Sequence, residues 1–351
     1  MSDTRLVIGL PAGSLANPNR GGNLVKLLED AGFKTRGYEK GGPSSFTTAN
    51  FLFGWDGRPQ EFSAQLGVGE LDVALAGDDW MQERVLELAL EYGTEIAPRK
   101  VQTLDRGSVR IVGIIDSDHD FDSTEAFLAD LCRRKALITA VSEMPYLALN
   151  WLQGALEKIG RFEQFSRFSV QKYKTPPKID SGIIIYETWG KTEAKIKNGG
   201  ADIGLEITQT GSAIRNYGLK IIETIMESET GVWINPEIRA DPAKVELLRM
   251  FLLNLYGAVN AENKVLIMFN VKKDCSEGIQ TFLAENNLFA DEPTVNQGED
   301  YDVYSIQVEL SDQRTSVAHI RYQLATLGAC NIDTIPIESS IPGLNVIGFL
   351  D

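Results

Sequence analysis

Short apolar segments alternate with segments of helical spacing along most of this chain, and this alternation restricts the fold more than any other feature. Apolar runs typical of buried strands occupy residues 5–10, 71–76, 108–115, 136–141 and 182–187. Helical patterns lie between them. In residues 23–31, for example, leucines and an alanine share one face and Gly32 supplies a stop. Strands that alternate with helices predict α/β architecture, with mostly parallel sheets and helices on both faces.

The alternation falls into two blocks, before and after about residue 105, within a chain of 351 residues. We expect each block to form one lobe around one sheet. Further strands at 220–227 and 231–234, and a helix that starts at Asp241-Pro242, are expected to return to the first lobe. The predicted lobe I therefore comprises 1–105 and 219–260, and lobe II comprises 106–218. A cleft between two lobes is the natural place for a ligand.

The pattern changes after Asn263. Strands are predicted at 264–270, from Thr294, at 301–309 and at 331–337, and helices at 276–283 and 312–327, the second capped by Ser311. The order β-α-β-β-α-β is that of a ferredoxin-like fold. We therefore expect a separate α+β domain over 262–351.

The charge and the cysteines exclude several functional classes. A formal charge of −15 argues against a nucleic-acid-binding surface, and an anionic ligand must be held by local groups. Cys132, Cys275 and Cys330 are far apart, which predicts no disulfide framework and no metal spacing. No apolar run approaches the ~20 residues of a membrane span. We expect a cytoplasmic protein that binds neither nucleic acid nor membrane.

One stretch, residues 202–218, has the pattern of an anion site. Alternating apolar residues at 203, 205 and 207 predict a strand, hydroxyls and one glycine follow over Thr208–Ser212, and helix-compatible residues end at Gly218. Free N–H groups and the dipole at a helix N-terminus favour a phosphate. The alternative is a plain strand-to-helix turn in which Ser and Thr only cap the helix.

A second polar turn, Gly77-Asp78-Asp79-Trp80, also follows an apolar strand. Ligands bind at this end of strands in open α/β sheets, but the two aspartates could equally cap the helix over 81–92. No nucleophile–base pair is visible, and His119 and His319 are expected to be solvated or structural. Carboxylates, hydroxyls and glycine turns suit a reaction catalysed by positioning and charge stabilisation.

Several motifs in this order resemble those of the ATP phosphoribosyltransferases, the first enzymes of histidine biosynthesis. They are Leu-Pro-Ala-Gly-Ser-Leu at 10–15, Asp-Val-Ala-Leu-Ala-Gly-Asp-Asp-Trp at 72–80, Trp-Gly-Lys-Thr-Glu at 189–193, Ala-Asp-Ile-Gly-Leu-Glu-Ile-Thr-Gln-Thr-Gly-Ser at 201–212 and Asn-Tyr-Gly-Leu at 216–219. The resemblance covers nearly the whole chain, including the C-terminal domain of the long form of this family.

The resemblance implies a two-lobed fold like that of type II periplasmic binding proteins, with an ACT-like C-terminal domain that binds histidine as feedback inhibitor. It implies that N1 of the adenine of ATP displaces pyrophosphate from phosphoribosyl pyrophosphate. Mg²⁺ would travel on the pyrophosphate, without metal ligands from the protein. A homo-oligomer, dimer or hexamer, is implied as well.

The resemblance also assigns residues to roles. The two catalytic carboxylates are Glu193 and Glu206, the second of which is often Asp in the family. The predicted contacts to phosphoribosyl pyrophosphate are Thr208, Gln209, Thr210, Gly211, Ser212 and Ala213. The predicted nucleotide contacts are Pro11, Gly13, Ser14, Arg58, Gly77, Asp78 and Asp79, and the histidine contacts are Asn270 and Thr294.

The chain departs from the family at Ala12, where relatives commonly carry Lys, and at Ala213, where Thr is common. The Gly-rich stretch 37–57 is unusual in length, and it suits either a surface hairpin or a loop that covers a ligand. The alternatives are a prephenate dehydratase-like enzyme, whose Thr-Arg-Phe turn does not occur here, and a non-catalytic ligand-binding or regulatory homologue.

Overall fold

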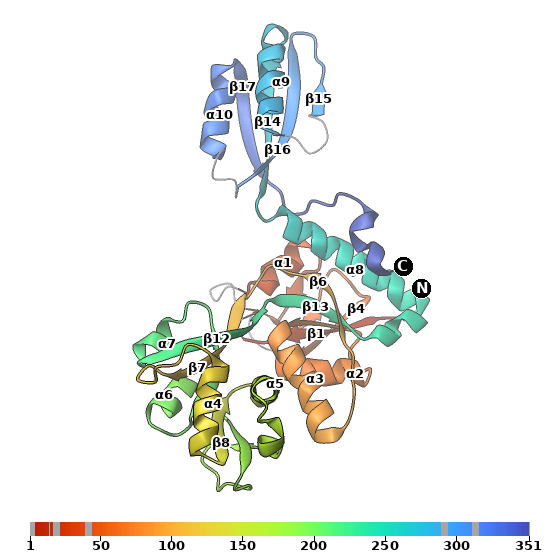
Figure 1. Ribbon diagram of the computed structural model, residues 1–351. Coiled ribbons are helices and arrows are strands. Elements are labelled where there is room, and N and C mark those ends of the chain that lie inside the picture. Colours follow the sequence, from red (N-terminus) through yellow and green to blue (C-terminus); the bar gives the residue numbers. More distant parts are fainter. Residues whose placement is uncertain are drawn as a thin grey trace. The chain divides into compact units, whose positions relative to one another are not determined.

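The computed structural model describes residues 4–13, 15–16, 22–38, 44–288, 294–310 and 316–350. The chain forms two compact units, which are described separately below. One contains the residues up to Val25 together with Thr35–Leu247, and the other contains Lys26–Lys34 together with the chain from Leu248 onward. Figure 1 labels those helices and strands for which there is room. No helix of the described residues is long and apolar enough to cross a membrane.

The first sheet has the order β4-β1-β5-β13-β6. Its strands are β1 (Leu6–Pro11), β4 (Leu52–Gly57), β5 (Val73–Gly77), β6 (Arg99–Thr103) and β13 (Thr230–Ile234). β1 is parallel to β4 and β5, whereas β13 is antiparallel to β5 and β6. The helices α2 (Pro59–Gly67) and α3 (Asp78–Tyr92) contribute Phe62, Leu66 and Met81 to the core beside β5.

The Gly-rich stretch over 37–57 is neither a simple hairpin nor a loop. Its last six residues form β4, a strand of the first sheet paired in parallel with β1 from Leu6↔Leu52 to Pro11↔Gly57. Two-residue strands, β2 (Thr35–Arg36) and β3 (Ser45–Phe46), pair before it, and residues 39–43 lie outside the described residues. The glycines hid the strand because they interrupt the alternation of side chains that marks a strand in sequence.

The second sheet has the order β12-β7-β11-β8-β10-β9. Its strands are β7 (Val109–Asp116), β8 (Leu137–Ser142), β9 (Phe168–Lys172), β10 (Gly182–Glu187), β11 (Ile203–Thr208) and β12 (Leu219–Ser228). Its helices are α4 (Thr124–Arg134), α5 (Pro145–Lys158), α6 (Thr192–Lys197) and α7 (Ser212–Asn216). β8, β10 and β11 run parallel, so the turns that follow them meet at one edge of the sheet.

The chain passes between the two sheets twice, and β12 corrects the predicted lobe boundary. β12 pairs with β7 along its length, from Leu219↔Asp116 to Ser228↔Val109, and belongs to the second sheet. The return to the first sheet therefore begins at Thr230 and not at residue 219. The other passage, between β6 and β7, runs beside it: Leu104 N donates to Thr230 O (3.0 Å) and Thr230 N donates to Arg106 O (2.9 Å). The apolar pattern of β12 predicted a strand but carried no information on its partner.

The second unit contains a four-stranded antiparallel sheet of order β15-β16-β14-β17. Its elements are β14 (Lys264–Lys272), α9 (Ser276–Glu285), β15 (Thr294–Asn296), β16 (Tyr301–Glu309), α10 (Val317–Thr326) and β17 (Ala329–Pro336). α9 and α10 cover one face (Figure 1), where Ile267, Phe269, Tyr304 and Ile306 are buried beneath Leu283 and Leu324. This is the predicted order of elements. The N-cap of α10 is Ser316, whose Oγ accepts from His319 N, so this helix begins later than expected; Ser311 lies outside the described residues.

Helix α8 (Pro242–Ala261) also differs from the prediction, because from Leu248 onward it belongs to the second unit and not to lobe I. Its side chain Phe251 packs on Phe33, which follows α1 (Leu24–Asp30), with ring centroids 5.2 Å apart. The chain after β17 returns to α8, where Ser340 N donates to Gly257 O (2.8 Å). A Cβ at Gly257 would lie 2.4 Å from Ser339 Oγ and 2.5 Å from Ile341 Cγ1, so both side chains would have to shift to admit it.

Candidate active site

The turn between β11 and α7 presents hydroxyls and backbone groups at the edge of the second sheet. Thr208 Oγ1 accepts from Gly211 N (2.8 Å), and the Thr210 hydroxyl accepts from Ser212 N (3.3 Å) and lies 2.9 Å from Ser212 Oγ. Arg215 donates to Ser212 Oγ (3.3 Å). Gln209, Thr210, Ser212 and Ala213 are exposed. The turn is thus ordered by its own hydroxyls and stays open to a ligand.

Gly211 has a left-handed backbone conformation, with φ +72°, which residues other than glycine rarely adopt. A Cβ on this residue would lie 3.0 Å from Arg215 Nη1 and 3.2 Å from Ile221 Cδ1. The Cβ would therefore point toward the arginine and the neighbouring strand, and not into open space over the turn. Glycine is needed here mainly because of the positive φ. The space that it leaves for Arg215 is a second, smaller reason.

Glu206 lies on β11 just before this turn. Its Oε1 accepts from Ile207 N (3.0 Å), whereas Oε2 is buried without a hydrogen-bond partner. Burial raises the pKa of Glu206 to about 7, aided by the charges of Glu193 and Glu143 and opposed by the nearby Thr192 hydroxyl and by the N–H of Ile207. A buried carboxyl oxygen without a partner is costly, so a small side-chain shift that lets it accept from a ligand hydroxyl would be favourable.

The parallel strands bring the predicted catalytic residues together. Glu143 follows β8, Glu193 lies in the first turn of α6 after β10, and Glu206 lies two residues before the end of β11. Because β8 is paired with both β10 and β11, these three carboxylates share the edge that carries the Thr208–Ser212 turn. The negative charges of Glu193 and Glu143 both raise the pKa of Glu206.

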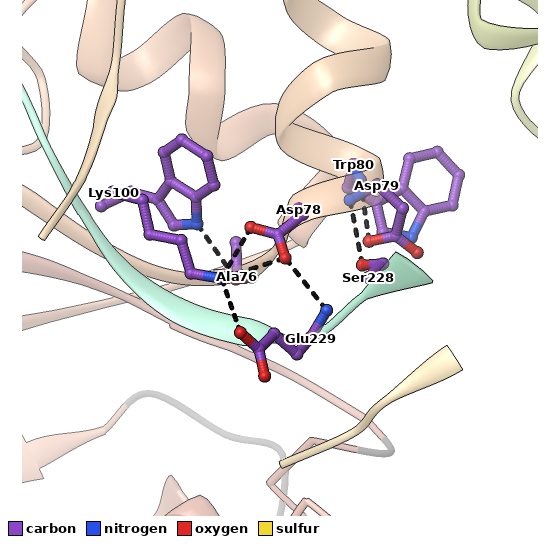
Figure 2. Close-up of polar contacts among 8 residues, drawn as sticks. Ala76, Asp78, Asp79, Trp80, Lys100, Ser228 and Glu229 are labelled. Carbon is purple, nitrogen blue, oxygen red and sulfur yellow. Dashed lines mark hydrogen bonds and ion pairs between the residues drawn. The ribbon is translucent and has the colours of Figure 1, made fainter. Parts of the chain in front are cut away.

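The turn between β5 and α3 is built differently (Figure 2). Asp78 accepts from Lys100 Nζ (2.8 Å) and from Glu229 N (3.0 Å), so its carboxylate ties α3 to the passage from β12 to β13. Asp79 is 5% exposed, and its Oδ1 accepts from Trp80 N (2.9 Å) while its N–H donates to Ser228 Oγ (3.1 Å). Burial raises the pKa of Asp79.

A pocket of about 510 Å³ gathers most of the predicted nucleotide residues. Its lining includes Gly13, Arg58, Gly77 and Asp79, together with Ala12, Trp80, Val109 and Ile207. Pro11 is not among the lining residues, and its carbonyl accepts from Tyr38 Oη (2.7 Å). Ser14 lies outside the described residues. Ile207 belongs to the strand that carries Glu206, so the pocket reaches the β11 side of the site.

The predictions from sequence did not include a second pocket, of about 490 Å³, which lies next to the first. Asp78, Arg110 and Gln209 line it, together with Glu227 and Glu229. The signal that could have found it is Arg110, a charged residue inside the otherwise apolar run 108–115.

Helix α3, which follows β5 of the first sheet, contacts helix α5, which follows β8 of the second sheet. Glu83 of α3 accepts from Tyr146 N (3.0 Å) and Leu147 N (2.7 Å), the first N–H groups of α5. Burial raises the pKa of Glu83 to about 8, against the lowering effect of these two donors. The helix that begins at Asp78 thereby caps the helix that follows Glu143.

Comparison with known proteins decides the family. The ATP phosphoribosyltransferase family model matches residues 58–254, more than half of the chain. The chain belongs to the ATP phosphoribosyltransferase family. The recognition made from the sequence and the predicted enzyme class, a phosphoribosyltransferase, are thereby confirmed.

Curated relatives of the same name extend the match. The chain is 27% identical over 345 residues to the ATP phosphoribosyltransferase of Geotalea daltonii, covering 97% of this chain and 100% of that protein. It is 26% identical over 301 residues to that of Desulfatibacillum aliphaticivorans, covering 84% and 85%. A chain of the ATP phosphoribosyl transferase (HisG:HisZ) complex from Thermotoga maritima matches with a TM-score of 0.48 and 16% identity, over 71% of this chain and 98% of that one. This structural likeness is too weak to add to the assignment.

The structure also places the two departures from the family pattern. Ala12, at the position where the resemblance leads us to expect Lys, lines the larger pocket. Ala213 is an exposed residue of α7. Among the residues that the structure describes, no group of three His, Cys, Asp or Glu side chains is placed to hold a metal ion.

The residues predicted to contact histidine, Asn270 and Thr294, lie on the sheet of the second unit. Asn270 of β14 pairs with Val303, and Thr294 of β15 pairs with Ser305, which in turn pairs with Met268. The register places Asn270 and Thr294 on one face but two strand spacings apart, roughly 10 Å. They do not form one compact site by themselves.

Proposed function

We propose that this protein condenses ATP with phosphoribosyl pyrophosphate to give phosphoribosyl-ATP and pyrophosphate. The bond from C1′ of the ribose to the pyrophosphate oxygen breaks as the bond from adenine N1 to C1′ forms. The observation that carries the proposal is the edge of the second sheet. There a hydroxyl-rich turn lies beside Glu206, which has one buried oxygen without a partner.

In this proposal the Thr208–Ala213 turn binds the 5-phosphate of phosphoribosyl pyrophosphate. Support comes from its exposed hydroxyls, from the left-handed Gly211 and from the guanidinium of Arg215 beside Ser212. Hydroxyl and guanidinium donors suit phosphate oxygens. We attribute phosphate binding to these donors and not to the helix dipole, because α7 has only five residues.

Glu206 and Glu193 are proposed to act on the ribose. The free Oε2 of Glu206 would accept a ribose hydroxyl, and the negative charge of the pair would stabilise the positive character that C1′ gains as pyrophosphate departs. The reaction needs neither a covalent intermediate on the enzyme nor a general base. Catalysis then rests on holding N1 and C1′ in line.

ATP is proposed to bind in the larger pocket, next to Gly13, Arg58, Gly77 and Asp79. Mg²⁺ would arrive bound to the diphosphate of the substrate, which agrees with the general Mg²⁺ dependence of the family. We assign the first sheet and its helices to nucleotide binding, and the second sheet, now including β12, to phosphoribosyl pyrophosphate. A biosynthetic role agrees with the predicted cytoplasmic location, which stays a prediction.

The direct test mixes the protein with ATP, phosphoribosyl pyrophosphate and Mg²⁺ and follows the near-ultraviolet absorbance of N1-ribosylated adenine. We expect product that depends on both substrates. A folded protein that binds both substrates and forms no product would instead be a non-catalytic homologue, an outcome for which Ala12 would be the first residue to examine.

We further propose that the β14–β17 domain is an ACT-like regulatory domain that binds histidine as a feedback inhibitor, as part of a homo-oligomer. Its β-α-β-β-α-β order and strand order support the class of domain. Histidine should inhibit the enzyme and raise its melting temperature. Calorimetry on the intact protein that detects no histidine binding would refute this part of the proposal.

A further inference from the structure

Arg110 is a half-buried cation that the mechanism above does not use. It lies near the start of β7, and among the described residues neither a hydrogen bond nor an ion pair reaches its guanidinium. The neighbouring cations differ: Lys100 pairs with Asp78, Lys220 with Asp122, and Arg215 donates to Ser212. Keeping a guanidinium partly out of water without a partner costs free energy, so we expect a ligand to supply the missing partner.

The strand register fixes where Arg110 lies. It pairs with Thr208 of β11 on one side and with Glu227 of β12 on the other. Side chains of residues that pair across strands share one face of a sheet. Arg110 is therefore next to Thr208, whose hydroxyl holds the Gly211 N–H of the phosphate turn.

The smaller pocket lies open around this side chain. Its lining includes Arg110, Gln209, Ser108, Asp78, Ser228 and Glu229. Asp78 and Glu229 already share Lys100, at 2.8 and 3.4 Å. Glu227, although a register neighbour of Arg110, makes no ion pair with it among the described residues. The pocket thus joins the phosphate turn to the strands that pass between the two sheets.

We propose that Arg110 binds a diphosphate group in this pocket, and this inference rests on the function proposed above. A ligand phosphate held at Thr208–Ser212 leaves Arg110 one strand away, where a second phosphoryl group of the same ligand can reach it. Two oxygens of a diphosphate match the fork of guanidinium donors, which a lysine could not reproduce. The acidic neighbours favour a diphosphate that carries Mg²⁺ over one that is fully charged.

The diphosphate could come from phosphoribosyl pyrophosphate or from ATP, and the experiment distinguishes these sources. Binding of pyrophosphate, phosphoribosyl pyrophosphate, ATP and ribose 5-phosphate is measured by calorimetry with Mg²⁺ on the full chain, for the parent, Arg110→Met and Arg110→Lys. We expect pyrophosphate and phosphoribosyl pyrophosphate to bind about tenfold more weakly or worse to Arg110→Met, and ribose 5-phosphate to bind as before. Arg110→Lys should recover only part of the loss. A loss for pyrophosphate and ATP, with phosphoribosyl pyrophosphate unchanged, would keep the diphosphate site and assign it to ATP.

Two control variants separate binding from architecture. Arg134→Met removes an exposed arginine that pairs with Asp130 on α4, and it should leave every affinity unchanged. Glu227→Gln removes the acidic register neighbour, and it should tighten pyrophosphate binding if Arg110 serves the ligand. If Arg110 instead forms an ion pair with Glu227 in solution, both Arg110→Met and Glu227→Gln should be less stable than the parent, and ligand binding should not change. That result would overturn the inference. So would a folded Arg110→Met variant that binds pyrophosphate as tightly as a parent that is active. If the parent itself forms no product, the proposed function is wrong instead.

Discussion

The β5–α3 turn and the β11–α7 turn have the same pattern in sequence, yet the structure uses them differently. Each follows a buried strand and opens a helix, and each is next to a carboxyl whose pKa burial raises, Asp79 in one and Glu206 in the other. In the first turn the acidic side chains are engaged by Lys100, Trp80 N and Glu229 N. In the second, Glu206 keeps a buried oxygen free and the hydroxyls stay exposed.

The difference teaches that polar residues after a strand do not by themselves identify a ligand contact. What distinguishes the two turns is hydrogen-bonding capacity that the protein leaves unused. Asp78 contributes mainly to the junction of the strands that pass between the sheets, whereas the β11–α7 turn is prepared for a ligand. The predictions below test this distinction in order of expected effect.

The largest effect is expected at the free carboxyl. Glu206→Gln keeps the size of the side chain but removes the charge next to the reacting carbon, and turnover should fall by about a hundredfold. Glu193→Gln should lower turnover as well, and both variants should stay folded. The measurement is the initial rate of product absorbance at saturating substrates. Full turnover in both variants would remove these residues from the mechanism.

A smaller effect, on stability, is expected at the engaged carboxyl. Asp78→Ala removes the acceptor for Lys100 Nζ and Glu229 N, which should cost about 1–3 kcal/mol of unfolding free energy. Denaturant unfolding measures the loss, while ribose 5-phosphate, which carries no diphosphate, should bind the folded variant as it binds the parent. If instead the variant is as stable as the parent and loses ATP affinity, Asp78 is a nucleotide ligand and the two turns are alike.

The smallest effect concerns pH. The pKa of Glu206 is about 7 in the folded protein, above its ordinary value of 4.5, so the folded state holds a proton that the unfolded chain releases. This contribution to stability is present below pH 4.5 and is lost as pH rises through about 7. Relative to the parent, Glu206→Gln should therefore gain on the order of 1–2 kcal/mol between pH 5 and pH 8. Glu157→Gln, an exposed change on α5, serves as control; parallel pH profiles for Glu206→Gln and the parent would contradict the raised pKa.

The sequence predicted the parts of the fold that depend on local pattern. β5, β7, β8, β10 and β11, the turns after them and the order of elements in the second unit follow from apolar periodicity and turn residues. The family followed from motifs in a fixed order, which the family model confirms. Local pattern also predicted the strand, the hydroxyl-rich turn and the helix around Thr208–Ser212, whereas binding of a phosphate there stays a proposal.

The remainder depends on partners far apart in the chain. The place of β12 is set by its pairing with β7, and that of β4 by its pairing with β1. The engagement of Asp78 requires Lys100 and Glu229, which no spacing in the sequence connects to it. Arg110 was not predicted as a site residue for the same reason, because only the strand register shows that it lies beside Thr208.

The central claim, that the β11–α7 turn binds phosphoribosyl pyrophosphate while the β5–α3 side serves ATP, is tested most directly at Gly211. Valine there must leave the left-handed backbone and displace Arg215, which should disorder the phosphate contacts. Gly199→Val is the matched control, because Gly199 has φ +69°, a Cβ added to it would have no other atom within 4 Å, and it lies outside the site. Each ligand is titrated separately against folded protein.

We predict that Gly211→Val binds phosphoribosyl pyrophosphate at least about tenfold more weakly, roughly 1.4 kcal/mol, while ATP binding changes much less and Gly199→Val alters neither. A folded Gly211→Val that binds phosphoribosyl pyrophosphate as tightly as the parent, or that loses both ligands equally, would contradict the account.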